Sequence, residues 1–154
     1  MYVFDEVPAW SGSDYAKIGK RPKWFASDPG LVANLPGWDE QEAYYDSDMS
    51  GKLVENWGYH EISSLRSLSP GLEVSQHRDS NRREVDFIVE NPKGDILGVE
   101  VKAGAMSSDD FSHLKWFAAN CAKRKFTGVV LYTGEDILPF GKNLFAVPMA
   151  CLAQ

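Results

Sequence analysis

The stretch that decides the fold is REVDFIVENPKGDILGVEVK, residues 83–102. Two runs rich in β-branched residues flank a loop that carries Asn-Pro and Lys-Gly-Asp, which is the pattern of two antiparallel strands joined by a turn. Side chains alternate between the two faces of a strand. We therefore expect Val85, Phe87 and Val89 to share one face and Asp86 to lie on the other.

The second strand of this hairpin carries two charged residues near its end. Glu100 and Lys102 are two residues apart, so they project from the same face. Antiparallel pairing can bring Asp86 to the same patch, which would then hold two acids and one base. The apolar positions of this strand share the opposite face: Leu97, Val99 and Val101.

Such a patch fits metal-assisted phosphodiester hydrolysis. Two carboxylates supply hard oxygen ligands for Mg²⁺, which usually keeps several waters and takes only one or two protein carboxylates. The metal polarises the phosphoryl oxygen, and a nearby lysine can position the attacking water and offset charge in the transition state. The alternative is that these charges form the solvated outer face of a hairpin, because short motifs have a high false-positive rate.

An upstream segment, residues 51–65, has the pattern of an amphipathic helix. Ser50 or Asp48 is its expected N-cap. Glu55 lies at the edge of the apolar stripe, where its side chain can reach the sheet. The stripe itself consists of Val54, Trp57, Ile62 and Leu65.

A glutamate on a helix, an aspartate on a strand and Glu-x-Lys on the next strand resemble the core of the P-D-(D/E)-x-K nuclease superfamily, at Glu55, Asp86, Glu100 and Lys102. The resemblance implies that Asp86 and Glu100 bind Mg²⁺ or Mn²⁺ with help from the Val101 carbonyl. It implies that Lys102 positions the attacking water, and that Glu55 holds a water on the metal or a second metal.

A closer resemblance covers most of the chain. It is carried by GKLVEN (51–56), REVDFI (83–88), GVEVKAG (98–104) and VLYTG (130–134). These segments look like an uncharacterised family that usually forms the C-terminal part of bacterial and archaeal P-loop ATPases, after an AAA+-type module and a winged helix. Residues 20–31 are similar to the connector of that family. The resemblance implies an N-terminal extension or connector at residues 1–50, as a remnant of the winged-helix region, and a P-D-(D/E)-x-K nuclease-like domain at residues 51–154.

Composition is that of one globular domain. The 154 residues are 44% hydrophobic and 25% charged, and their length suffices to bury a core. The net charge is −6, which disfavours a simple nucleic-acid binder because phosphate contacts dominate the affinity of such proteins. Residues 1–50 hold 4 basic and 9 acidic residues (−5), so residues 51–154 carry only −1. A local basic patch therefore remains possible in the second part.

The best candidate for a phosphate-binding patch consists of Arg78, Arg82 and Arg83, which bracket a turn beside the Asp86 strand. Their alternative role is to form ion pairs with Glu84 or Asp79. The shorter basic cluster at residues 20–23 is better interpreted as a solvated turn than as a phosphate contact.

Other function classes find no support in the sequence. Residues 134–142 lack the G-x-x-x-x-G-K-[ST] pattern, so we expect no ATP site in this chain. Cys121 and Cys151 form neither a disulfide framework nor a metal-ligand spacing, and cytoplasmic localisation is expected. No apolar run is long enough for a membrane span. The single histidines are interpreted as structural: His60, His77 and His113.

The sequence predicts an α/β domain with a restriction-endonuclease-like mixed β-sheet at residues 72–149, flanked by helices at 51–68 and 108–122. Residues 126–132 are expected to form a central strand, and residues 144–149 an edge strand because of Pro148. The expected partner is nucleic acid, DNA rather than RNA. The rival hypothesis is a non-catalytic module that docks a P-loop ATPase or forms a homo-oligomer through exposed apolar residues in 1–40.

Overall fold

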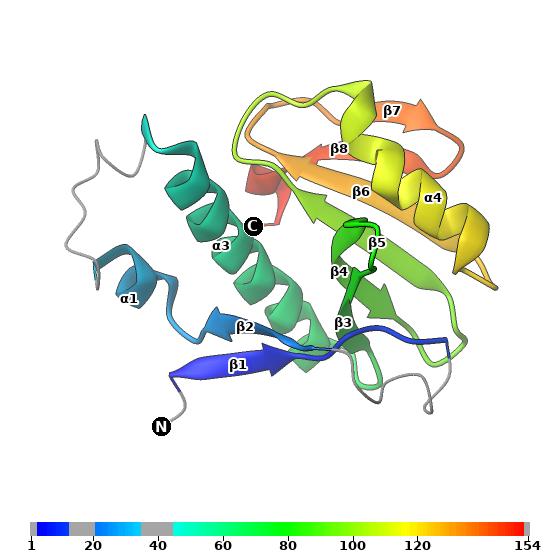
Figure 1. The fold of residues 1–154 in the computed structure, drawn as a ribbon, viewed down its shortest axis with the longest axis horizontal. Coiled ribbons are helices and arrows are strands. Elements are labelled where there is room, and N and C mark those ends of the chain that lie inside the picture. Colours follow the sequence, from blue (N-terminus) through cyan, green and yellow to red (C-terminus); the bar gives the residue numbers. More distant parts are fainter. Residues whose placement is uncertain (1–2, 13–20, 35–44, 153–154) are drawn as a thin grey trace.

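The structure is a computed structural model that describes residues 3–12, 21–34 and 45–152 (Figure 1). Among the described helices, none combines the length and apolar character that a membrane crossing requires. The strands are β1 (Phe4–Val7), β2 (Lys23–Ala26), β3 (Glu73–Arg78), β4 (Glu84–Glu90), β5 (Ile96–Val101), β6 (Phe126–Tyr132), β7 (Leu138–Gly141) and β8 (Leu144–Pro148). The helices are α1 (Pro29–Asn34), α3 (Ser47–Leu68) and α4 (Ser112–Asn120), with 3₁₀ turns at Ser108–Phe111 and Met149–Cys151.

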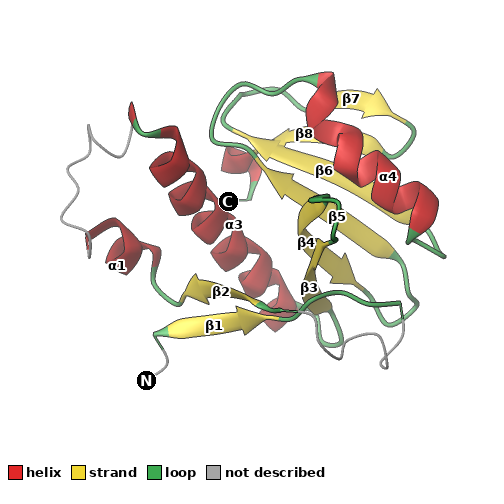
Figure 2. Cartoon of the chain, in the orientation of Figure 1, coloured by secondary structure: helices red, strands yellow, loops and turns green. Residues whose placement is uncertain are grey.

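Six strands form one mixed sheet in the order β3-β4-β5-β6-β8-β7. The pairs β3–β4, β4–β5 and β7–β8 are antiparallel, whereas β5–β6 and β6–β8 are parallel. A separate antiparallel pair, β1–β2, lies beside α3 (Figures 1 and 2). The predicted α/β class and the mixed sheet flanked by helices are therefore confirmed.

Two apolar clusters hold helices on the two faces of the sheet. On one face, Tyr59 and Ile62 of α3 pack with Phe25 of β2 and Phe87 of β4. On the other face, Leu114 and Phe117 of α4 pack with buried residues of β4, β5 and β6. Burial of such large side chains contributes about 1.5–3 kcal/mol each, so the two clusters account for much of the stability.

The central hairpin forms as predicted. Strands β4 and β5 pair with Phe87 opposite Val99 and Glu90 opposite Ile96. Continuing this register by one position places Asp86 opposite Glu100. Leu97, Val99 and Val101 all contact the cluster on the α3 face, as expected from alternation.

The face prediction for β4 is wrong at one residue. Val85 packs in the cluster on the α4 face, whereas Phe87 packs in the cluster on the α3 face. The reason is a bulge: β4 advances three residues from Ile88 to Val85 where β3 advances two, from Ser75 to His77. A bulge inserts an unpaired residue and redirects side chains, and bulges are frequent beside functional sites. Asp86 lies in this bulge.

Helix α4 approaches the sheet over a pair of glycines. Gly98 of β5 and Gly128 of β6 are register partners in the parallel ladder. A Cβ at Gly98 would lie 2.8 Å from Phe126 Cζ and 3.0 Å from Leu114 Cδ2, and a Cβ at Gly128 would lie 2.6 Å from Leu144 Cδ2. The missing side chains thus let α4 lie directly on β5 and β6, close to Glu100.

Helix α3 begins earlier than predicted. Its N-cap is Asp46, whose carboxylate accepts hydrogen bonds from the Asp48 and Met49 N–H groups at 2.9 and 3.1 Å. The proposed caps, Asp48 and Ser50, lie inside the first turn. An Asp at the N-cap satisfies N–H groups that have no partner within the helix.

The buried stripe of α3 also differs from the prediction. Ile62 is buried as expected, but Leu65 is exposed and Val54 and Trp57 are half-buried. The buried positions are Asn56, Gly58, Tyr59 and Ile62. Gly58 allows the close approach, because a Cβ there would lie 3.2 Å from Val101 Cγ2.

Asn56 links α3 to β2, and its loss is expected to destabilise the protein. Its side chain accepts a hydrogen bond from the Ala26 N–H at 2.9 Å and donates one to the Ala26 carbonyl at 3.3 Å. Asn56→Ala leaves a buried N–H without a partner, so we expect unfolding free energy to fall by about 1–3 kcal/mol in urea denaturation. Ser64→Ala, on the exposed side of the same helix, is the control and should change it by less than about 0.5 kcal/mol. Equal effects of the two substitutions would contradict this role of Asn56.

The edge-strand prediction for the C-terminal segment is wrong. β8 lies between β6 and β7, and β7 is the edge. Pro148 is tolerated because β7 pairs only with residues 144–146 of β8, so no strand lies beside Pro148 on that side. Strand β7 falls within residues 134–142, the segment that lacks the phosphate-loop pattern.

Candidate functional site

A groove of about 930 Å³ opens where β4 begins and β5 ends. Its walls come from the β1–β2 hairpin, the first turns of α3, the β3–β4 turn and the start of α4. All four residues predicted to be catalytic line this groove: Glu55, Asp86, Glu100 and Lys102. The structure therefore brings together side chains from one helix and two strands, as the sequence pattern required.

Asp86 stands at the centre of the site. One of its oxygens, Oδ2, accepts a hydrogen bond from the Val101 N–H at 2.9 Å. The other, Oδ1, lies 3.9 Å from Lys23 Nζ. The carboxylate is thus anchored to the neighbouring strand by one oxygen, while the second lies toward Lys23 within the groove.

Glu100 is the most buried acid of the groove, with only 5% of its surface exposed. Among the described residues, no hydrogen-bond donor reaches its Oε1. His113 Nδ1 lies 3.8 Å from Glu100 Oε1, but that nitrogen accepts the Glu84 N–H at 3.4 Å and so has no proton to donate to the carboxylate. Burial, together with the negative charge of Asp86, raises the pKa of Glu100 to about 9. The ionised form of this carboxylate is therefore poorly compensated.

Glu55 reaches the groove from α3 and forms an ion pair with Lys23 of β2. Burial and the charge of Asp86 raise the pKa of Glu55 to about 7, although the ammonium of Lys23 opposes this shift. Lys23 also lies 5.7 Å from the centre of the Phe25 ring. One lysine thus provides positive charge to two of the three acids.

Lys102 lies on the α4 side of the groove. Its Nζ is 3.6 Å from Asp110 Oδ1, and its backbone N–H donates to the Leu131 carbonyl at 2.8 Å. Asp110 belongs to a capping box with Ser107, which fixes its position at the start of the 3₁₀ turn. The side chain of Lys102 is partly exposed, so it can reach a ligand in the groove.

The predicted arginine patch is divided by the structure. Arg78 and Arg82 line the groove, and Arg78 pairs with Glu84 at 2.7 Å. Arg82 has a φ of 61°, a left-handed conformation that is uncommon for a residue with a side chain. Arg83 is held elsewhere: its Nε is 2.7 Å from Asp79 Oδ2 and its guanidinium lies 3.7 Å from the centre of the Trp116 ring.

The carboxylate oxygens of the groove provide some, but not all, of the ligands that a hard divalent cation requires. In the described ranges, no three His, Cys, Asp or Glu side chains gather into a ready metal cluster. Glu100 nevertheless keeps Oε1 without a hydrogen-bond donor in the described structure, and Asp86 Oδ1 lies 3.9 Å from Lys23 Nζ. Because Mg²⁺ takes one or two carboxylates and fills the rest of its shell with water, these oxygens fit such an ion.

Sequence reasoning missed two residues of the site, Lys23 and His113. Lys23 was assigned to a solvated turn, and Lys20 of the same cluster lies outside the described residues. His113 was interpreted as structural, but it lines the groove beside Glu100. The available signal for Lys23 was its position beside the short apolar run at residues 24–26, since alternation in a strand directs Lys23 and Phe25 to the same face.

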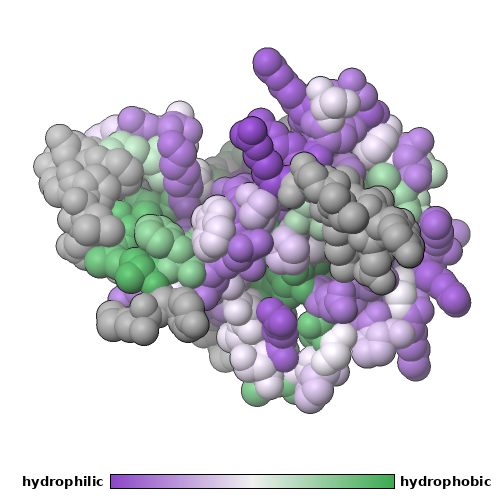
Figure 3. Space-filling model, turned by 60° about the horizontal axis from the view of Figure 1, so that its bottom comes forward, coloured by the Kyte–Doolittle hydropathy of each residue, from purple (hydrophilic) through white to green (hydrophobic). Residues whose placement is uncertain are grey.

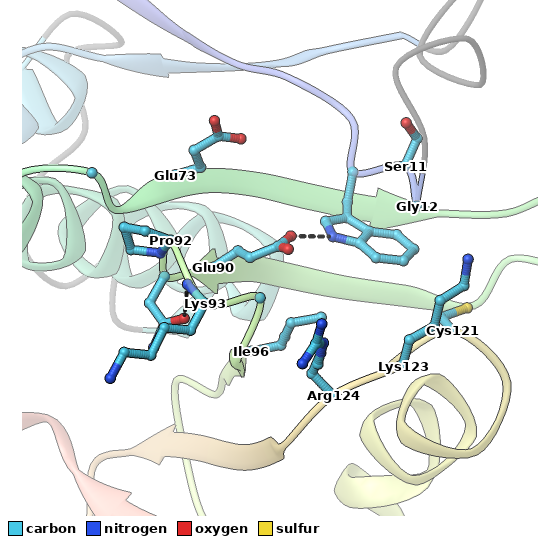
Figure 4. A pocket seen from close by; sticks show the side chains of 14 residues that line it. Ser11, Gly12, Glu73, Glu90, Pro92, Lys93, Ile96, Cys121, Lys123 and Arg124 are labelled. Carbon is cyan, nitrogen blue, oxygen red and sulfur yellow. Dashed lines mark hydrogen bonds between the residues drawn. The ribbon is translucent and has the colours of Figure 1, made fainter.

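A second cavity of about 570 Å³ lies at the opposite end of β5, where Ile96 lines it (Figure 4). Trp10 Nε1 donates to Glu90 Oε2 at 3.1 Å on its wall. Lys93, Lys123 and Arg124 add positive charge around it. None of the four residues predicted to be catalytic lines this cavity, so we place the candidate site in the groove.

The fold and the groove define an α/β domain with a mixed six-stranded sheet and a carboxylate-rich site at one end of its central hairpin. The chain belongs to the family described as "Domain of unknown function (DUF4143)", whose model matches residues 50–152. Among curated proteins, none matches the sequence.

A solved structure that resembles the chain is described as a half-complex from the tetradecameric assembly of Thermococcus gammatolerans McrB AAA+ hexamers with bound McrC. The similarity covers 64% of this chain and 27% of that chain, with 14% identity and a TM-score of 0.44. A likeness this distant assigns no function. The P-D-(D/E)-x-K core, the division at residue 50 and the cytoplasmic location stay predictions.

Proposed function

We propose that the groove is a site for divalent-cation-assisted hydrolysis of nucleic-acid phosphodiesters, DNA rather than RNA. The observation that supports this most is Glu100: a buried carboxylate oxygen without a donor in the described structure faces a groove that already holds Asp86 and Glu55. Gathering three acids costs stability unless a cation compensates their charge. Sites where pKa values are strongly perturbed in a cleft are candidates for function.

The proposal gives each residue a separate role. Asp86 and Glu100 would hold Mg²⁺ or Mn²⁺ together with the Val101 carbonyl, and Glu55 would bind a water or a second ion. When bound, the cation supplies polarisation of the phosphoryl group and acidification of water. Lys102, at the other side of the groove, would position the attacking water and stabilise the charge that develops on the phosphate.

The test is a Mn²⁺ titration by calorimetry. We expect the wild type to bind one or two equivalents, and Asp86→Ala to abolish this binding because it removes the central ligand. Asp136→Ala, which alters an exposed acid outside the groove, should bind like the wild type. Equal binding by the two variants would refute the assignment of Asp86.

A second candidate function is a non-catalytic module that docks a P-loop ATPase or a second copy of the chain. The observation in its favour is the ion pair between Lys23 and Glu55, because it compensates one of the acids without a metal. Absence of Mn²⁺ binding to the wild type at millimolar metal would favour this function. Copurification with an ATPase module would then be the next measurement.

A further inference from the structure

Two aromatic side chains of the β1–β2 hairpin are exposed in the groove. Trp24 is 59% exposed and Phe4 is 54% exposed, and both line the groove that holds the acids. Figure 3 shows hydrophobic side chains gathered on the side of the molecule where β1, β2 and α1 lie. Aromatic side chains are normally among the best covered, so two in one groove need an explanation.

The strand register places these two rings on one face. Phe4 is opposite Ala26 and Glu6 is opposite Trp24, so Phe4 and Trp24 are diagonal neighbours on the same side of the hairpin. Diagonal neighbours are about 7–8 Å apart, a distance that aromatic side chains can bridge. Lys23 and Phe25 point to the other face, where Phe25 stacks on Tyr59 at 4.7 Å. The packed face fixes the hairpin, and the exposed face presents the rings.

The groove also carries cations at its rim. Lys52, Arg78 and Arg82 line it together with the two rings, and of these Lys52 is paired with Asp48 and Arg78 with Glu84. Aromatic faces combined with positive charge are the chemistry that binds single-stranded nucleic acid, because bases stack on the rings while phosphates follow the cations. A duplex keeps its base faces stacked on one another and cannot use such rings.

We propose that Trp24 and Phe4 form a stacking platform for the bases of an unpaired nucleic-acid segment along the wall of the groove, on the face of the hairpin opposite to the one from which Lys23 contacts Glu55 and Asp86. This deepens the proposed function, on which it rests, by naming single-stranded or locally unpaired nucleic acid as the substrate class. A protein partner fits less well, because protein interfaces are depleted of charged residues at their core and this groove is lined by them.

The experiment is fluorescence anisotropy of a labelled, unstructured single strand and of a duplex with the same sequence, in EDTA at low ionic strength. We expect the wild type to prefer the single strand. Trp24→Ala should weaken single-strand binding about 5- to 150-fold, which corresponds to the loss of one stacked base. Trp24→Phe should retain most of the affinity, since it keeps an aromatic face.

Leu68→Ala is the matched control, because Leu68 is 79% exposed and lies at the far end of α3. Unchanged single-strand affinity in Trp24→Ala, or equal losses for single strand and duplex, would overturn the platform. A loss of self-association in Trp24→Ala without any change in nucleic-acid binding would assign the surface to a second copy instead.

The outcomes separate the platform from the proposed function. Trp24-dependent single-strand binding without Mn²⁺ binding would retain the platform and overturn the metal site. Mn²⁺ binding that depends on Asp86, without single-strand binding, would retain the metal site and overturn the platform.

Discussion

Replacing Glu100 with glutamine is expected to stabilise the metal-free protein above about pH 5 and to flatten the dependence of its stability on pH. Burial and the charge of Asp86 raise the pKa of Glu100 from 4.5 to about 9, so the folded state binds this proton more tightly than the unfolded state does. The unfolding free energy therefore falls as pH rises between about 4.5 and 9, by at most about 1.4 kcal/mol per pH unit. Glutamine keeps the shape without the charge.

Urea denaturation in EDTA at pH 5 and pH 8 measures this effect. We expect the wild type to lose stability between the two values and Glu100→Gln to lose less. Glu55→Gln should change the pH slope only between about pH 4.5 and 7, because the pKa of Glu55 is raised only to about 7, and its effect on stability should then stay constant at higher pH. Glu135→Gln, at an exposed acid, is the control. The same pH slope in Glu100→Gln and in the wild type would show that Glu100 is not the buried acid that destabilises the folded protein.

Most of the sheet follows from local sequence. The hairpin of β4 and β5 was predictable because two β-branched runs and their turn lie within 20 residues, and Glu100 and Lys102 share a face by alternation alone. The bulge at Asp86 was not predictable from β4 itself. It arises where β4 pairs with β3, and nothing in the β4 sequence encodes that register.

Only part of the candidate site was predictable from the sequence, namely its three acids and Lys102. Glu55, Asp86, Glu100 and Lys102 lie in elements whose order matches a known pattern. Lys23 and Glu55 are separated by 32 positions, and their contact depends on how the β1–β2 hairpin docks on α3 through Asn56. His113 depends on the close approach of α4 over Gly98 and Gly128. The positions of Lys23 and His113 in the site are therefore consequences of tertiary packing, which the periodicity of a sequence does not reveal.

Two lysines of the same groove are expected to respond in opposite ways to the same substitution. Lys102→Met should lower any phosphodiester cleavage at least about 100-fold, the effect of removing a positioned catalytic group, while Mn²⁺ binding persists. Lys23→Met should tighten Mn²⁺ binding, by about tenfold, because the ammonium of Lys23 occupies Glu55 and lies 3.9 Å from Asp86 Oδ1.

Calorimetry and a cleavage assay on both variants distinguish the two roles. If Lys23 supplied the positive charge for catalysis, Lys23→Met would lose cleavage and Lys102→Met would keep it. If the groove were a purely structural cluster, Lys23→Met would leave three acids with less compensation and would only destabilise the protein, with no gain in Mn²⁺ affinity. The contrast has a structural basis, since Lys23 faces the acids from β2 whereas Lys102 is directed to Asp110 in the 3₁₀ turn before α4. A gain in metal affinity in Lys23→Met combined with a loss of cleavage in Lys102→Met is the result that only a metal-dependent site predicts.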